Sequence, residues 1–241
     1  MQSNRRHLSL IDMHSHFLPG IDDGSKTPEE SREILRISRM QHVRIIAATP
    51  HYYSDKSVEQ FLSERQEAFE KVQKILHPEF DWPEIFLGAE VAYHPGLIYE
   101  ERLPELCYEG TRFLLLEMPF SRWSPNVLRD VERIQAIYGV TPVIAHIERY
   151  FREQDRSVIN ELMAMDVLIQ INASYVLNCY PSFRVRHMVR DGMVNILGSD
   201  CHNLENRAPN LGIAAKQLEA WGMQEELRDI RDQAARVLGI L

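Results

Sequence analysis

Short apolar runs in this chain end on side chains that can bind a metal ion. Seven runs have the length of a buried strand, and six of them end on, or next to, histidine, glutamate or aspartate. A buried ionised side chain is unfavourable unless it is paired or bound to a metal. Imidazole suits zinc and iron, and carboxylate suits magnesium and manganese, so these ends together predict a metal site. The side chains are, in chain order, His14, His16, His51, Glu90, Glu117, His146, Asp200 and His202.

Two of these ends contain ligand candidates that are spaced two residues apart. In an extended strand such residues point to the same face, so His14 and His16 of "DMHSH" can bind one ion together. Asp200 and His202 of "GSDCHNLENR" share a face for the same reason. We therefore predict that both pairs lie at the metal site.

A loop after the first run adds two aspartates. Asp22 and Asp23 lie between Pro19-Gly20 and Gly24, and aspartate and glycine are also ordinary turn residues. One of the two aspartates can still turn toward the histidines and bind a metal. The spacing leaves open which of the two does so.

Three further candidates have an alternative, structural explanation. Glu90 and Glu117 each follow an apolar run, where a lone glutamate more often pairs with an arginine. His51 follows Pro50 and could be a hydrogen-bonded histidine of the core. Because histidines stand at the equivalent ends of three other runs, we interpret all three side chains as metal ligands.

Two arginines follow ligand candidates closely. Arg149 comes three residues after His146, and Arg207 comes five residues after His202. Most arginines are simply exposed, but a guanidinium group at such a site can bind a phosphate through two parallel hydrogen bonds. We interpret this pair as a phosphate clamp.

The sixth run ends in neutral Asn172 and Ser174. The other five histidines are expected to be structural or at the surface: His7, His42, His77, His94 and His187.

Two other catalytic chemistries fit these residues less well. Cys201 and Arg207 have the C-x5-R spacing of cysteine-dependent phosphatases, but the residues between them include Glu205 and no glycine. Strand alternation also points Cys201 away from Asp200 and His202.

Amidohydrolase barrels begin with H-x-H and often bridge two metals with a carbamylated lysine. None of the five lysines of this chain lies at a strand end.

The segments between the apolar runs have the length and periodicity of helices. Thr27 is the expected N-cap of the first helix, Pro28 its first residue and Glu30 its capping-box partner. Further helices are expected over residues 57–76, 125–138, 154–165, 182–191, 205–220 and 224–238. Seven strands that alternate with helices predict an α/β fold, a closed or nearly closed barrel of parallel strands. Active sites of such barrels lie at the carboxyl ends of the strands, where the ligand candidates fall.

Composition and charge restrict the class of protein. A content of 44% hydrophobic and 26% charged residues is typical of a globular domain, and we expect one domain over residues 1–241. The net charge of −8 gives no general attraction to nucleic acid or to an anionic membrane. No run approaches the roughly 20 apolar residues of a membrane span. Cys107, Cys179 and Cys201 are odd in number and lack C-x-x-C spacing, which favours a reducing cytoplasm.

The motifs in combination resemble one family. In order they are DMHSH, DDG, TPH, GAE, LLLEM, AHIERY and SDCHNLENR. They are similar to those of the polymerase-and-histidinol-phosphatase (PHP) superfamily. Within it they most resemble the manganese-dependent protein-tyrosine phosphatases encoded with bacterial capsule and exopolysaccharide synthesis genes. The match extends from Ile11 to about Arg207. Cys201 and the loop YYSDKSVEQ, which follows His51, depart from the family pattern.

The resemblance implies a distorted (β/α)7 barrel of the PHP type with three metal ions. Mn²⁺ is the expected metal, with Fe, Zn or Mg as alternatives. The groups implied for the three ions are His14, His16, Glu90 and Asp200; Glu90, Glu117 and His146; and Asp23, His51 and His202. Arg149 and Arg207 match the family's phosphate-contacting arginines.

The implied activity is hydrolysis of phosphotyrosine on a protein. The expected substrate is the C-terminal tail of a membrane-associated bacterial tyrosine kinase that regulates capsular or exopolysaccharide synthesis. Neither a nucleic-acid partner nor direct membrane insertion is expected. An alternative is a PHP phosphoesterase for a small phosphomonoester such as histidinol phosphate, which would share the metal site. Two weaker alternatives are a PHP nuclease, disfavoured by the acidic charge, and a non-catalytic barrel, disfavoured by the full ligand set.

Overall fold

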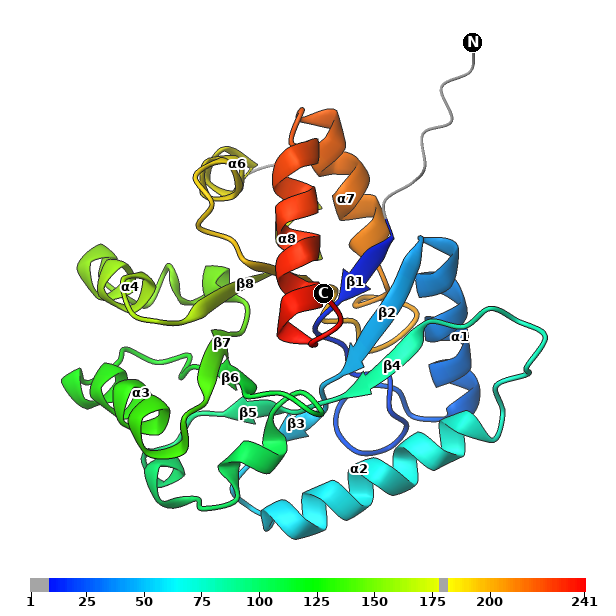
Figure 1. Ribbon diagram of the computed structural model, residues 1–241, viewed down its shortest axis with the longest axis horizontal. Coiled ribbons are helices and arrows are strands. Elements are labelled where there is room, and N and C mark those ends of the chain that lie inside the picture. Colours follow the sequence, from blue (N-terminus) through cyan, green and yellow to red (C-terminus); the bar gives the residue numbers. More distant parts are fainter. Residues whose placement is uncertain (1–8, 178–181) are drawn as a thin grey trace.

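Parallel strand pairing dominates the structure, a computed structural model that describes residues 9–177 and 182–241 (Figure 1). Within these residues the strands form two sheets, and every pairing between them is parallel. The first sheet has the order β1 (Leu10–Asp12), β2 (Val43–Ala48), β4 (Glu84–Leu87). The second has the order β3 (His51–Tyr52), β5 (Glu90–Ala92), β6 (Phe113–Glu117), β7 (Thr141–Ile144), β8 (Leu168–Asn172), β9 (Ile196–Gly198). His7 and Cys179 lie outside the described residues.

Two of the seven predicted strands are each interrupted once. Thr49-Pro50 separates β2 from β3, and proline has no N–H to donate to a sheet. Gly88 and Ala89 separate β4 from β5. The pairing nevertheless continues across both breaks, because Gly88 N donates to Ala48 O (2.8 Å) and Glu90 N donates to Pro50 O (3.0 Å). The two sheets are therefore one continuous surface that bends at these breaks.

The first and last strands close this surface into a ring. Beyond the end of β1, Met13 N donates to Leu197 O (3.3 Å) and His16 N donates to Cys201 O (2.8 Å). In the opposite direction, Asp200 N donates to His14 O (2.8 Å). The predicted fold, a distorted (β/α)7 barrel, is confirmed.

The amino-terminal end of the barrel is filled by the last helix, α8 (Gln224–Val237), which crosses it in Figure 1. One hydrophobic cluster joins inward-facing strand residues to this helix. Its members include Ile11, Met13, Leu115, Val143, Ile196, Ala234, Ala235, Val237 and Leu238. Phe113 and Leu168, the first residues of β6 and β8, pack against the same cluster. Apolar side chains therefore fill this end of the barrel.

The other helices cover the outside of the barrel, over a second and larger hydrophobic cluster. They are α1 (Pro28–Met40), α2 (Val58–Gln73), α3 (Pro125–Tyr138), α4 (Arg156–Met163), α5 (Ala173–Leu177), α6 (Ser182–Arg190) and α7 (Leu211–Ala220). The described part of the chain also contains three short 3-10 helices, η1 (Pro95–Tyr99), η2 (Leu103–Leu106) and η3 (Ile147–Tyr150). Among the described residues, no helix combines the length and apolarity needed to cross a bilayer.

The predicted helix positions are confirmed, with two differences in detail. The helix predicted over 205–220 begins only at Leu211, because Asn203 Oδ1 accepts hydrogen bonds from the N–H groups of Glu205 and Arg207 and holds this segment in a turn. Thr27 is the N-cap of α1 and accepts from Glu30 N (3.2 Å). The Glu30 carboxylate accepts from Lys26 N (2.7 Å), one residue earlier than a standard capping box.

Candidate metal centre

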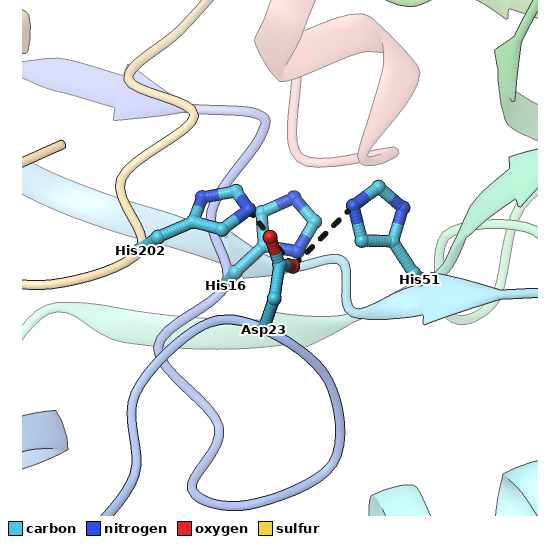
Figure 2. Close-up of side chains that lie close together, drawn as sticks. All are labelled: His16, Asp23, His51 and His202. Carbon is cyan, nitrogen blue, oxygen red and sulfur yellow. Dashed lines mark ion pairs between the residues drawn. The ribbon is translucent and has the colours of Figure 1, made fainter.

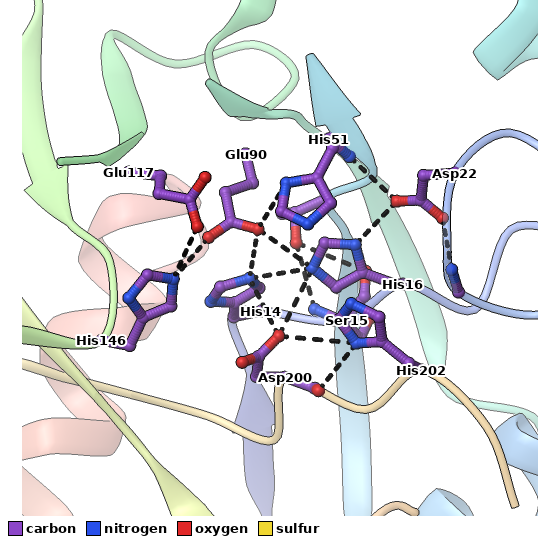
Figure 3. Close-up of polar contacts among 12 residues, drawn as sticks. His14, Ser15, His16, Asp22, His51, Glu90, Glu117, His146, Asp200 and His202 are labelled. Carbon is purple, nitrogen blue, oxygen red and sulfur yellow. Dashed lines mark hydrogen bonds and ion pairs between the residues drawn. The ribbon is translucent and has the colours of Figure 1, made fainter. Parts of the chain in front are cut away.

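The predicted ligand side chains converge at the carboxyl end of the barrel (Figure 3). Each comes from the end of β1, β6, β7 or β9, from the start of β3 or β5, or from the loop before α1. Most of them are buried. They include three groups of residues, and within each group the potential ligand atoms all lie within 4.8 Å of one another. The groups are His14, His16 and Asp200; His51, Glu90 and Glu117; and His16, Asp23, His51 and His202.

The most deeply buried part of the cluster contains two histidines and two carboxylates. Nε2 of His14 lies 3.0 Å from Nε2 of His16, and each nitrogen lies 3.1 Å from Glu90 Oε2. Each also lies 3.5 Å from Asp200 Oδ1. Ligand atoms around a tetrahedral ion at about 2.1 Å lie about 3.4 Å apart. The observed separations therefore fit four ligands of one divalent cation.

The other oxygen of Glu90 faces a second set of side chains. Nε2 of His146 lies 2.7 Å from Glu90 Oε1 and 3.4 Å from Glu117 Oε1. On the opposite side of Glu90, Nδ1 of His51 lies 3.1 Å from Oε2. Glu90 thus lies between His51 and His146, as Figure 3 shows, in the position of a carboxylate that could bridge two ions.

The third group, drawn in Figure 2, includes the most exposed candidate ligand. Asp23 Oδ1 is 3.3 Å from Nε2 of His202 and 3.7 Å from Nε2 of His51. The imidazole of His202 stacks on that of His16, with centroids 3.9 Å apart. The Asp23 side chain is 65% exposed, far more than the other members. This group is the one that an ion or a substrate from solvent would reach first.

The two aspartates of the DDG motif have different positions. Asp23 faces the third group, as favoured by the family resemblance. Both oxygens of Asp22 already have partners, because Oδ2 lies 2.7 Å from Nδ1 of His16 and accepts from His51 N (2.9 Å), and Oδ1 accepts from Gly24 N (2.8 Å). A Cβ on Gly24 would lie 2.0 Å from His16 O, so only glycine allows this loop to fold against the histidine.

Two of the candidate ligands have left-handed backbone conformations. The φ angles are +33° at His146 and +54° at Asp200. Residues other than glycine rarely adopt such angles, because the side chain crowds the backbone. The strain coincides with the points where β7 and β9 end and the chain turns its side chains into the cluster. Strained backbone at functional sites is a recurrent feature of proteins.

Charge interactions within the cluster are strong. Burial alone would raise the pKa of Glu90, but His14, His146 and His16 hold that pKa well below its usual range. Burial opposes the charged form of His16, yet hydrogen bonds to Asp22 and Glu90 raise its pKa to about 10. Burial lowers the pKa of His202 to about 4, which leaves this imidazole neutral at pH 7. Neutral imidazole and ionised carboxylate are the forms that bind metals, so a metal that binds His16 would displace a proton from this histidine.

Three buried atoms of the cluster make no well-directed hydrogen bond among the described residues, although each lies within ion-pair distance of another charged group. They are His51 Nδ1, Asp200 Oδ1 and His202 Nε2. Buried polar atoms are normally satisfied, so each unsatisfied one requires an explanation. A bound cation would satisfy all three, and the donor set therefore fits a metal.

The two predicted arginines lie at the rim of the cluster. Nη2 of Arg149 is 2.8 Å from Asp200 Oδ2, and Nη2 of Arg207 is 2.7 Å from Asp200 Oδ1. The two side chains are 36% and 34% exposed. Both guanidinium groups can therefore contact the cluster and a ligand from solvent. The phosphate clamp itself stays a prediction.

Comparison with known proteins agrees with this geometry. Residues 10–238 match the model of a family described as capsular polysaccharide synthesis, CpsB/CapC. The chain belongs to the CpsB/CapC family.

Curated members of the CpsB/CapC family are similar over most of this chain. It is 30% identical to the tyrosine-protein phosphatase CpsB of Streptococcus agalactiae, covering 86% of this chain and 88% of that protein. It is 28% identical to the tyrosine-protein phosphatase YwqE of Bacillus subtilis, covering 82% and 79%.

Solved structures have the same fold. One comes from a study of YwqE from Bacillus subtilis and CpsB from Streptococcus pneumoniae, which are described there as unique metal-dependent tyrosine phosphatases. It has a TM-score of 0.82 at 25% identity to this chain. It covers 96% of this chain and 95% of that chain. The phosphotriesterase homology protein from Escherichia coli has a TM-score of 0.57 at 13% identity, covering 95% and 98%, and is similar in fold alone.

Sequence reasoning missed several residues that position the candidate ligands of this CpsB/CapC protein. Gln170 Oε1 lies 3.2 Å from Nδ1 of His14 and accepts from His146 N (2.7 Å). Asn172 Nδ2 donates to Asp200 Oδ2 (2.7 Å). The sixth run shows only that Gln170 and Asn172 are polar and two residues apart, which places them on one face of a strand without identifying their partners; Ser174 is exposed.

Cys201 is not placed as a nucleophile in this CpsB/CapC protein. Its side chain is fully buried, and burial raises the pKa of the thiol well above its usual range. Its neighbour Asp200 faces the cluster. The interpretation of the C-x5-R spacing as coincidence agrees with these positions.

Proposed function

We propose that this chain is a metal-dependent phosphatase that hydrolyses phosphotyrosine on a protein. The observation that supports this most is the convergence of nine candidate ligands at one end of the barrel, with two arginines at their rim. Relatives over more than four fifths of the chain are named tyrosine-protein phosphatases. Electropositive groups next to a metal cluster suit a phosphate substrate.

The proposed metals are three ions of Mn²⁺, with Fe, Zn or Mg as alternatives. The proposed ligand groups are His14, His16, Glu90 and Asp200; Glu90, Glu117 and His146; and Asp23, His51 and His202. Divalent ions lower the pKa of water, which supplies a nucleophile at neutral pH, and they neutralise phosphoryl oxygens. The mixture of carboxylate and imidazole ligands supports such ions rather than copper(I) or an iron–sulfur cluster.

Residues of the chain would orient the substrate and the ligands. The guanidinium groups of Arg149 and Arg207 would bind phosphoryl oxygens and stabilise the charge that develops on them in the transition state. Asp22 and Gln170 would keep the rings of His16 and His14 in place. The phenol of tyrosine has a pKa of about 10, so it leaves without strong help from a general acid.

The proposed substrate is a phosphotyrosine-containing C-terminal tail of a membrane-associated bacterial tyrosine kinase. The resemblance to capsule and exopolysaccharide phosphatases supports this partner. The proposed location is the cytoplasm, supported by the buried free thiols of Cys107 and Cys201.

A comparison of substrates tests the proposal. Purified protein loaded with Mn²⁺ is expected to hydrolyse a phosphotyrosyl peptide with a higher kcat/KM than histidinol phosphate. Metal content measured on the same sample shows whether the cluster is loaded. Preference for histidinol phosphate would replace the proposal by the small-molecule phosphoesterase, and DNA cleavage without phosphotyrosine hydrolysis would replace it by a nuclease.

A further inference from the structure

Two half-exposed aromatic rings lie against the metal cluster. Tyr53 follows β3, is 47% exposed and stacks on the imidazole of His51, with centroids 5.1 Å apart and planes 22° apart. Phe120 follows β6, is 50% exposed and stacks on His146, with centroids 6.0 Å apart and planes 19° apart. Each ring thus contacts a candidate ligand and is still about half accessible to solvent. A large ring left half open beside a polar cluster is available to a ligand.

The two rings contact imidazoles that lie on opposite sides of Glu90. His51, under Tyr53, is 3.1 Å from Glu90 Oε2, and His146, under Phe120, is 2.7 Å from Glu90 Oε1. Figure 3 shows Glu90 between these two imidazoles. The rings therefore lie beside the two imidazoles that adjoin Glu90, the proposed shared metal ligand.

Phe120 also adjoins one of the candidate phosphate-binding groups. The guanidinium carbon of Arg149 lies 5.8 Å from the centroid of the Phe120 ring, and the same guanidinium group reaches Asp200. A phosphoryl group held by Arg149 would thus have an aromatic surface next to it. The group attached to that phosphoryl would lie along this surface.

We propose that Tyr53 and Phe120 bind the phenyl ring of the substrate and so select aryl over alkyl phosphate monoesters. The inference rests on the proposed phosphatase function and adds to it the determinant of tyrosine specificity. The phenyl ring of phosphotyrosine has two faces and an edge for offset or edge-to-face contacts with these rings. The side chains of phosphoserine and histidinol phosphate present only a short alkyl carbon next to the phosphoryl oxygen. Loss of one such contact weakens binding about two- to tenfold.

Two competitive inhibitors separate recognition of the ring from recognition of the phosphoryl group. The full-length, Mn²⁺-loaded chain is assayed with a phosphotyrosyl peptide, and Ki is measured for phenylphosphonate and for inorganic phosphate. Tyr53→Leu and Phe120→Leu are each expected to raise the Ki of phenylphosphonate about two- to tenfold. The Ki of inorganic phosphate and the metal content are expected to stay unchanged.

Conservative and remote variants complete the test. Tyr53→Phe and Phe120→Tyr keep the ring and are expected to keep the wild-type ratio of the two Ki values. Tyr99→Leu removes a ring that is 74% exposed at the end of η1, and it is expected to leave the ratio unchanged.

Each remaining outcome contradicts the inference in a distinct way. If both Ki values stay at the wild-type level in both leucine variants, the rings do not bind the substrate. An equal rise of both Ki values, or loss of metal, means that the rings only support His51 and His146. Failure of the wild-type protein to hydrolyse any phosphotyrosyl peptide overturns the proposed function first, and the ring inference with it.

Discussion

Asp22 contacts His16 from the side opposite to the ligand cluster. Its Oδ2 lies 2.7 Å from Nδ1 of His16, while Nε2 of the same ring lies 3.1 Å from Glu90. The carboxylate therefore favours the proton on Nδ1 and directs the lone pair of Nε2 into the cluster. Such carboxylate–histidine pairs set the orientation and basicity of metal-binding imidazoles.

Replacement of Asp22 by asparagine is expected to weaken metal binding without removing a ligand. The amide keeps the size of the side chain but loses its charge. The Asp22→Asn variant should bind Mn²⁺ about 10- to 100-fold more weakly, as measured by isothermal titration calorimetry. Asp55→Asn, at an exposed position of the next loop, provides the control. Wild-type affinity in Asp22→Asn would mean that Asp22 is only a turn residue.

His14→Ala is expected to lose both metal and activity, whereas Arg149→Ala is expected to lose activity alone. His14 is fully buried among candidate ligands, so its removal should abolish both metal binding and phosphatase activity. Arg149 contacts the cluster from the rim, so Arg149→Ala should keep its metal. It should lower kcat/KM on the order of 100-fold, the usual effect of removing one charge-stabilising donor. Full activity of Arg149→Ala would remove this arginine from the mechanism.

Metal removal is expected to lower thermal stability. A ligand at 100 times its Kd stabilises the native state by about 2.7 kcal/mol, which for a domain of this size corresponds to about 5–10 °C in Tm. Calorimetry of chelator-treated protein, before and after addition of Mn²⁺, measures this shift. The shift should vanish in His14→Ala and persist in His187→Ala, whose side chain is 67% exposed and pairs with Asp191.

Glu148 is expected to make stability fall as pH rises. Burial of its carboxyl group raises its pKa from 4.5 to about 7, and Oε2 has no hydrogen-bond partner among the described residues. Because the folded-state pKa lies above the unfolded-state value, this contribution is complete below about pH 4.5. It is lost as pH increases to about 7, and its full size is about 3 kcal/mol.

The variant Glu148→Gln isolates this contribution. Glutamine stays neutral, and it can still accept the hydrogen bond from Asn172 N that Glu148 Oε1 accepts (3.2 Å). Urea unfolding of metal-free protein between pH 5 and 7.5 should show a stability advantage of the variant over wild type that increases with pH. Glu153→Gln changes the same charge at an exposed position and should show no such trend. A pH-independent difference for Glu148→Gln would contradict the assignment.

Features that depend on neighbouring residues in the chain could be predicted from the sequence. His14, Glu117 and His146 adjoin apolar runs, and parallel strands bring their carboxyl ends to one edge, so the cluster followed from strand positions alone. Thr27 as N-cap likewise needs only its own helix. The division of two runs into β2 with β3 and β4 with β5 was not predicted, because it depends on how Pro50 and Gly88 fit the bent sheet.

Features that depend on distant contacts could not be predicted in this way. Gln170 touches a histidine that precedes it by 156 residues, so its own run contains no sign of the partner. The different positions of Asp22 and Asp23 arise from how one loop folds on His16. The late start of α7 at Leu211 results from side-chain hydrogen bonds of Asn203, which compete with helix formation.

Helix α8 fills the amino-terminal end of the barrel, so this end can be closed only after the last helix of the chain has been synthesised. Ile11 and Met13, near the beginning of the chain, complete their packing only against Ala234, Val237 and their neighbours near its end. A growing chain that has reached His202, just after β9, already contains every candidate ligand, yet its barrel is still open at the opposite end. Contacts between residues so far apart form slowly, since a long loop must close first. Such a chain could therefore bind a metal ion before the opposite end of its barrel is closed.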